Sequence, residues 1–246
     1  MRNLLILAII VLASCKPQTK SHTAQEVIDQ SIIASGTDKV SASTISFKFR
    51  KGHYKATRNN GEFLLEGDVL RGENRKVIDS LNNHDFTRYI NGEKFHAPDS
   101  LKVRYSGSVN SVHYFSVLPF GLNDKAVKKK LLDEVNVKGK SYYKVRVSFS
   151  EEGGGEDFDD IFIYWVRKDS FLIDYLAYSY RVNGGGMRFR EVTNERVVNG
   201  IRFVDYNNYK AKNASTKLEN LDKAFEKSEL KKLSEINLEN IQVVLN

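Results

Sequence analysis

Short segments of alternating polarity, separated by tight turns, run through most of the chain. In Ile45, Phe47 and Phe49, apolar side chains alternate with polar ones, which is the pattern of a strand with one buried face. Turn signals such as the Asn-Asn-Gly run at 59–61 and the Asn-Gly pair at 199–200 separate successive segments. Strands joined by such short connections run antiparallel. The pattern therefore predicts about nine or ten strands in an antiparallel sheet.

Helical spacing interrupts this pattern in a few places. Thr23 and Glu26 have the spacing of a capping box, which opens a helix that Gly36 ends. Residues 108–120 show no clean alternation and are predicted to form a short apolar helix packed on the sheet, with 122–132 helical as well. A sheet of this size either curls or splits. Because neither strand face is uniformly polar, we expect an α+β fold: a single strongly curved antiparallel sheet, an incomplete barrel, with helices covering its concave face.

The N-terminal segment predicts export and a lipid anchor. Its apolar run at 4–13 has ten residues, whereas a bilayer core needs about 20 residues of helix, so the run is typical of a signal peptide. It ends in Leu-Ala-Ser-Cys at 12–15, which resembles the lipobox of bacterial lipoproteins, and Cys15 is the only cysteine. An ordinary secretory signal with an accidental cysteine is the alternative. We expect residues 1–14 to be a lipoprotein signal peptide, 15–23 a lipidated tether and 24–246 a single half-barrel domain.

The composition and motifs of the chain argue against several classes of function. Lys and Arg outnumber Asp and Glu by 38 to 31, but no RNP-like or helix-turn-helix pattern accompanies this charge, so no nucleic-acid partner is expected. With Cys15 lipidated, no thiol remains for catalysis, and a Cys-rich zinc site cannot form. The acidic loop at 151–160 matches no standard calcium-loop spacing and is predicted to be a solvated hairpin tip rather than a metal site. We expect no cofactor and no metal.

Four sequence blocks carry a resemblance to a known family. They are S-V-N-S-V-H-Y-F-S-V-L-P-F-G-L-N-D at 108–124, E-E-G-G-G-E-D-F-D-D-I-F-I-Y-W at 151–165, D-Y-L-A-Y-S-Y at 174–180 and N-G-I-R-F-V-D-Y-N-N-Y at 199–209. These blocks resemble an uncharacterised family of lipoproteins common in Bacteroidetes-type bacteria, over almost the whole mature chain. That family in turn is similar to the lipoprotein-carrier (Lol) fold, an incomplete antiparallel barrel whose concave face, lidded by helices, holds acyl chains. The resemblance implies a lipid-anchored protein of the cell envelope, and Lys16 directly after Cys15 indicates that it faces the periplasm.

Residues on the 108–120 helix and on the strands around it are the candidates for ligand contact. Asn110 and His113 are expected to share a helical face and to reach a buried ligand together. An acyl chain in a gap between the helix and the aromatic strand residues gains about 25 cal/mol per Å² of surface removed from water and needs no charged anchor. Packing of the helix on the sheet explains the same residues equally well. The candidates are Asn110, His113, Tyr114, Phe115, Trp165, Tyr178 and Phe189.

Three functions of different classes fit this sequence. The first is a membrane-anchored envelope lipoprotein, expected as a monomer, that binds an apolar or amphiphilic ligand (a lipid or an acyl chain) in a helix-lidded half-barrel. The second is a structural envelope lipoprotein that contacts other proteins. The third is an envelope hydrolase with His113, Asn110 and a strand carboxylate such as Asp160 or Asp205 in its cleft. No G-x-S-x-G or S-x-x-K nucleophile motif is present, so the sequence favours the first function and assigns no catalytic residue.

Overall fold

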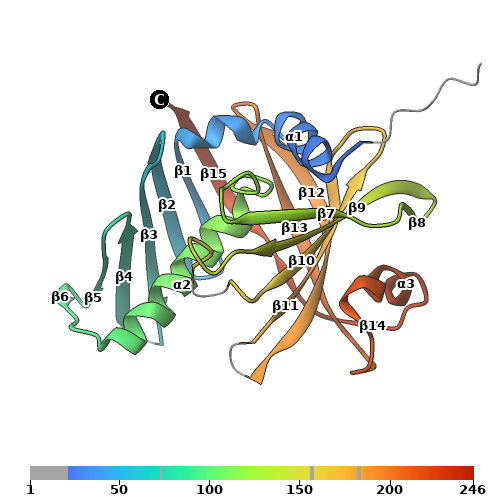
Figure 1. The fold of residues 1–246 in the computed structure, drawn as a ribbon. Helices are drawn as coiled ribbons and strands as arrows, with labels where there is room; N and C mark the ends of the chain where they lie inside the picture. The colour runs from blue at the N-terminus through green and yellow to red at the C-terminus, as the bar shows by residue number, and fades with distance from the viewer. Residues whose placement is uncertain (1–21, 73, 156–157, 182–183) are drawn as a thin grey trace, which may run out of the picture.

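The structure is a computed structural model that describes residues 22–246 apart from 73, 156–157 and 182–183. Its strands form two antiparallel sheets, with helices between and beside them (Figure 1). The predicted signal peptide, Cys15 and most of the predicted tether lie outside the described residues.

The seven-stranded sheet is called sheet A and the eight-stranded sheet is called sheet B. In spatial order, sheet A contains β15 (Leu238–Leu245), β1 (Ala42–Phe49), β2 (Gly52–Asn59), β3 (Glu62–Arg71), β4 (Arg75–Asn82), β5 (Phe86–Ile90) and β6 (Glu93–Lys94). Sheet B contains β14 (Leu230–Ile236), β13 (Ile201–Ala211), β12 (Gly186–Val198), β11 (Ile173–Tyr180), β10 (Ile161–Arg167), β9 (Lys140–Phe149) and β7 (Val127–Leu131), with β8 (Val135–Val137) also paired to β9. The helical segments are α1 (Ala24–Ala34), η1 (Thr37–Ser41), α2 (Asp99–Ser116), η3 (Leu218–Asn220) and α3 (Leu221–Glu226).

The expectation of a single sheet is wrong, because the strands split into two sheets instead of curling into one. The chain changes sheet at two places. Helix α2 leads from β6 to β7 at the far edge of sheet B, and Asn237 alone separates β14 from β15, which pairs with β1. Short hairpin connections predict which strands are neighbours, but they do not indicate where the chain passes from one sheet to the other. The α+β class and the antiparallel pairing are confirmed.

Sheet B is buried on both faces, which explains the nearly unbroken burial along β10. Its concave face packs against α1 and the end of α2, whereas α3 and η3 cover the opposite face (Figure 1). Strand side chains alternate between the two faces. Phe162 and Tyr164 therefore lie on the concave face, and Ile163 and Trp165 lie beneath α3. Helix α2 also crosses sheet A and contacts β3, β4 and β5.

Two helical predictions need correction. Helix α2 spans Asp99–Ser116 and not 108–120, because its first half is polar and its apolar spacing begins only later. Residues 122–132 are not helical: β7 lies there, with half-buried and exposed positions alternating along an edge strand paired to β9. Within the described ranges, no helix has both the length and the apolar character that a membrane crossing requires.

Helix α1 begins and ends as predicted. Thr23 and Glu26 form the capping box, and Gly36 follows the helix in the left-handed conformation with φ of 62°. A Cβ atom on Gly36 would lie 1.8 Å from the carbonyl oxygen of Gly200. We therefore expect Gly36→Ala to lower the free energy of unfolding by about 2 kcal/mol or more, since left-handed backbone alone costs a non-glycine residue about 1–2 kcal/mol.

Gly107→Ala is the matched control for this prediction. Gly107 lies inside α2, and a Cβ atom added there would meet no described atom within 4 Å apart from its chain neighbours and the backbone of its own helix. Alanine in a helix interior should raise the free energy of unfolding by about 0.5–1 kcal/mol. Urea unfolding of both variants checks the pair, and a Gly36→Ala protein as stable as wild type would show that the close approach to Gly200 does not occur.

Candidate functional site

A strip of aromatic side chains lies on the concave face of sheet B, against the C-terminal end of α2. The ring centroid of Phe115 is 5.3 Å from that of Tyr178 on β11, and Phe162 on β10 stacks on Tyr178 at 5.4 Å. The hydroxyl oxygens of Tyr114 and Tyr164 are 3.2 Å apart. Phe115 and Tyr178 are only half-buried, so part of their apolar surface is still accessible. These five residues are called the aromatic strip.

Arg190 on β12 lies among these rings. Its guanidinium carbon is 3.9 Å from the ring centroid of Phe115 and 5.1 Å from that of Tyr178. Its Nη2 atom donates a hydrogen bond to the Tyr178 hydroxyl oxygen at 3.0 Å. Arg190 is 8% exposed, and its buried Nε atom has no hydrogen-bond partner among the described residues. The arrangement holds a desolvated cation against aromatic faces, where cation–π attraction favours it.

In the described part of the chain, no negative charge is paired with Arg190. The ion pairs there involve other arginines and lysines. Burial raises the pKa of Tyr114 to about 12 and also raises the pKa of Tyr164 and of Tyr206, so these phenols stay neutral at neutral pH. The site therefore presents an uncompensated positive charge in apolar surroundings.

Three of the predicted ligand-binding residues meet in the aromatic strip: Tyr114, Phe115 and Tyr178. The expected packing of the 108–120 helix on Trp165 and Phe189 is wrong. Both of these rings are fully buried on the opposite face of sheet B, beneath α3, with their centroids 5.5 Å apart. Strand alternation is the reason, because neighbours in sequence point to opposite faces and only one of each pair can face α2.

Asn110 and His113 are not brought together at one site. His113 is 1% exposed and its Nε2 atom donates to the carbonyl oxygen of Glu66 on β3 at 3.0 Å. Its ring centroid lies 5.8 Å from those of Phe47 and Tyr54, in the core between α2 and sheet A. Asn110 is exposed. His113 therefore packs against sheet A, whereas the aromatic strip belongs to sheet B.

Arg190 is not among the site residues predicted from the sequence. Arg188 and Arg190 flank Phe189 along β12, and of these three residues only Phe189 is a candidate from the sequence. With Phe189 on the α3 side, strand alternation places both arginines on the concave face. An arginine on a buried face of a sheet is a candidate site residue. The sequence can identify it only after the two faces of the sheet have been assigned.

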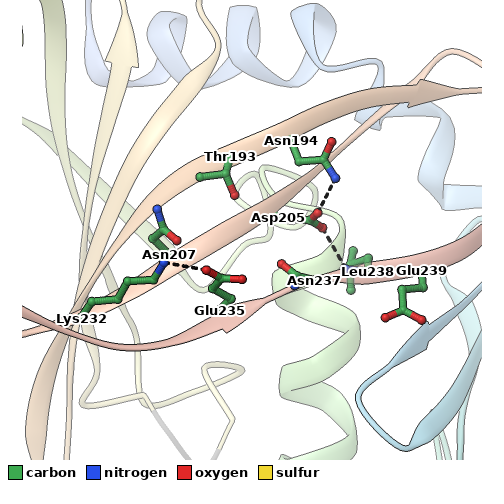
Figure 2. Close-up of a pocket in the computed structure, with 9 residues that line it drawn as sticks. All are labelled: Thr193, Asn194, Asp205, Asn207, Lys232, Glu235, Asn237, Leu238 and Glu239. Atoms are coloured by element: carbon green, nitrogen blue, oxygen red, sulfur yellow. Dashed lines mark hydrogen bonds and ion pairs between the residues drawn. The ribbon is translucent and has the colours of Figure 1, made fainter.

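A polar hollow lies where the chain passes from β14 to β15 (Figure 2), and its volume is about 530 Å³. Its buried acid, Asp205, is 4% exposed. The Asp205 carboxylate accepts hydrogen bonds from the backbone N–H of Leu238 at 2.8 Å, from Arg196 at 2.8 Å and from Asn194 at 2.7 Å. These bonds join β12 and β13 of sheet B to β15 of sheet A, so Asp205 stabilises the junction of the sheets.

The hydrolase alternative requires a histidine and a carboxylate in one cleft. In this structure each has other partners: His113 bonds the Glu66 carbonyl oxygen, and Asp205 accepts from three donors at the sheet junction. Among the residues that the structure describes, no three His, Cys, Asp or Glu side chains are grouped so that they could hold a metal ion.

Comparison with known proteins places the chain in a family and a fold. Residues 2–238 match a family described as a family of unknown function, DUF6503, and no curated protein matches the sequence. A DUF1329 family protein from Desulfovibrio piger matches with a TM-score of 0.53 and 13% identity, covering 90% of this chain and 93% of that chain, which shows a shared fold. A LolA superfamily protein from Nitrosomonas europaea matches with a TM-score of 0.47 and 9% identity, covering 91% of this chain and 92% of that chain. The predicted membership of an uncharacterised family is confirmed.

Proposed function

Because this chain belongs to DUF6503, a family of unknown function, we propose its function from its own residues. It is a lipid-anchored protein of the cell envelope, facing the periplasm, that binds an apolar or amphiphilic ligand such as a lipid or an acyl chain. The ligand lies on the concave face of sheet B, and the aromatic strip is the observation that carries the proposal.

The aromatic strip suits an alkyl chain for two reasons. Its rings come from β10, β11 and the end of α2, so they form a wall between a sheet and a helix. Phe115 and Tyr178 are half-buried although they lie on the inner face, and covering their remaining apolar surface contributes about 25 cal/mol per Å². The alternative, a structural lipoprotein, does not explain why aromatic surface stays accessible on the inner face of the sheet.

Photo-crosslinking of the full chain tests this proposal. The chain is reconstituted in phosphatidylcholine nanodiscs and exposed to two probes, a fatty acid and a fatty alcohol with the same diazirine-bearing alkyl chain. We expect label on peptides that contain Phe115 and Tyr178, and none above background on the α3 peptide, which covers the opposite face. Equal labelling of both faces, or no labelling by either probe, would overturn the proposal.

Lipidation at Cys15 anchors the protein in this proposal, although Cys15 lies outside the described residues. We expect Cys15→Ala to abolish acylation and cleavage of the leader, because the sulfur atom of Cys15 is the atom to which the diacylated glyceryl group would be attached. Mass spectrometry of the N-terminal peptide from membrane fractions checks this. An unacylated Cys15 in the wild-type membrane protein would leave the leader as an ordinary secretory signal.

A further inference from the structure

Arg190 places a positive charge beside the otherwise uncharged side chains of the aromatic strip. We propose that its guanidinium binds the anionic head group, a carboxylate or a phosphate, of an amphiphile. The inference rests on the proposed function, in which the alkyl chain of that amphiphile lies along the aromatic strip.

Two buried polar atoms at this position have no hydrogen-bond partner among the described residues. They are Nε of Arg190 and Oδ1 of Asn208. Arg190 and Asn208 are partners across the β12–β13 ladder, so their side chains leave the same face of the sheet. The Asn208 amide nitrogen reaches the Ser234 hydroxyl at 3.4 Å. Because buried donors are normally satisfied, the N–H at Nε of Arg190 remains to be paired with an acceptor from outside the described chain.

The positive charge of Arg190 is also without an acidic partner among the described residues. Glu191, the neighbour of Arg190 in sequence, accepts hydrogen bonds from Tyr209 at 2.9 Å and Asn207 at 3.1 Å, away from the concave face. Asp205, on the next strand, is paired with Arg196. A buried guanidinium without a counter-charge is costly, whereas a carboxylate or a phosphate can accept two parallel N–H bonds from its planar fork. An anionic head group would therefore satisfy the unpaired Nε atom and neutralise the charge together.

Other buried arginines provide a comparison. Arg88 donates two hydrogen bonds to the Asp79 carboxylate, at 2.6 and 2.7 Å, so its charge and its fork are both satisfied within the chain. The Nη1 atom of Arg58 also lacks a partner in the described part of the chain. Arg58 lies on sheet A, however, with its guanidinium 5.5 Å from the ring centroid of Phe120, outside the aromatic strip. At Arg190, an open guanidinium and an aromatic wall for an alkyl chain coincide.

The test uses the nanodisc assay with three probes that share one diazirine-bearing chain: a fatty acid, an alkyl phosphate and a fatty alcohol. In the wild-type protein we expect the better of the two anionic probes to label the aromatic strip at least about tenfold more strongly than the alcohol, in line with the strength of charge-assisted hydrogen bonds. Comparison of the acid with the phosphate identifies the head group. In Arg190→Gln the ratio of anion to alcohol labelling should fall to near unity.

Arg188→Gln is the matched control, because Arg188 is on the same strand and half-buried, and it donates to the carbonyl oxygen of its own neighbour Met187 at 2.8 Å. It should keep the wild-type ratio. Arg190→Lys keeps the charge without the planar fork and should give an intermediate ratio, which preserves the test if Arg190→Gln fails to fold. Equal labelling by alcohol and anions in the wild type, or an unchanged ratio in folded Arg190→Gln, would overturn this inference and leave the proposed function standing. Failure of all three probes would instead remove the proposed function.

Discussion

Replacing Asp222 by alanine is expected to lower the free energy of unfolding by about 3–5 kcal/mol, the usual cost of leaving a buried charge without its partner. Asp222 in α3 is 2% exposed, and its Oδ2 atom lies 3.0 Å from Nζ of Lys144 on β9, which is 5% exposed. The same oxygen accepts from the indole N–H of Trp165 at 3.2 Å. Alanine would leave the Lys144 ammonium with only the Glu219 carbonyl oxygen as acceptor among the described residues, and the indole with none.

The exposed pair of Lys232 and Glu235 is the matched control. Its atoms are 2.7 Å apart, but the side chains are 43% and 58% exposed, so Glu235→Ala should leave the stability close to that of wild type. A double variant, Lys144→Met with Asp222→Ala, removes the stranded charge and should be more stable than Asp222→Ala alone. Urea unfolding curves of the variants measure these differences. If Asp222→Ala costs no more than Glu235→Ala, water reaches Lys144 and the pair does not hold α3 on sheet B.

The buried pair beneath α3 also shows what sequence patterns can predict in this protein. Alternation located most of the strands and their antiparallel neighbours, because both are local properties of the chain, but it missed β7. It also predicted that Trp165 and Tyr178 are inward-facing, but it could not predict that sheet B has two buried faces. Trp165 lies beneath α3 and Tyr178 faces α2. The assignment of a face depends on where the sheet splits and on which helix covers each side, and these contacts are remote in sequence.

The candidate site depends on the same remote contacts. Phe115 and Tyr178 were predicted together because both are aromatic and the segment around Phe115 is apolar. Arg190 was absent from that prediction. Its neighbours in sequence do not indicate that the side chain contacts aromatic rings on β11 and α2. A paired arginine such as Arg88 and an unpaired one such as Arg190 look alike in sequence, and only the assembled sheet distinguishes them.

Acid should destabilise the protein through His113 well above the pH at which carboxylates protonate. Burial, aided by the charge of Arg58, lowers the pKa of His113 to about 4, against the partial opposing effect of the hydrogen bond to Glu66. The unfolded chain binds this proton near the ordinary histidine pKa of about 6.5. Between these two values the unfolded state holds more protons than the native state, so stability falls as the pH is lowered. The loss from pH 7 to pH 4 should reach about 3 kcal/mol from this residue.

Two glutamine variants isolate the contribution of His113 from that of other acid-sensitive groups. In His113→Gln the amide can still donate to the Glu66 carbonyl oxygen but cannot titrate, so the free energy of unfolding should be lower at pH 7 and nearly flat between pH 6.5 and about 4.5. His53 is exposed on β2, and His53→Gln should keep the steep wild-type slope. Urea unfolding at a series of pH values gives both slopes. A wild-type slope no steeper than that of His113→Gln would mean that the native state accepts the proton, and that α2 lifts from sheet A far enough to hydrate the ring.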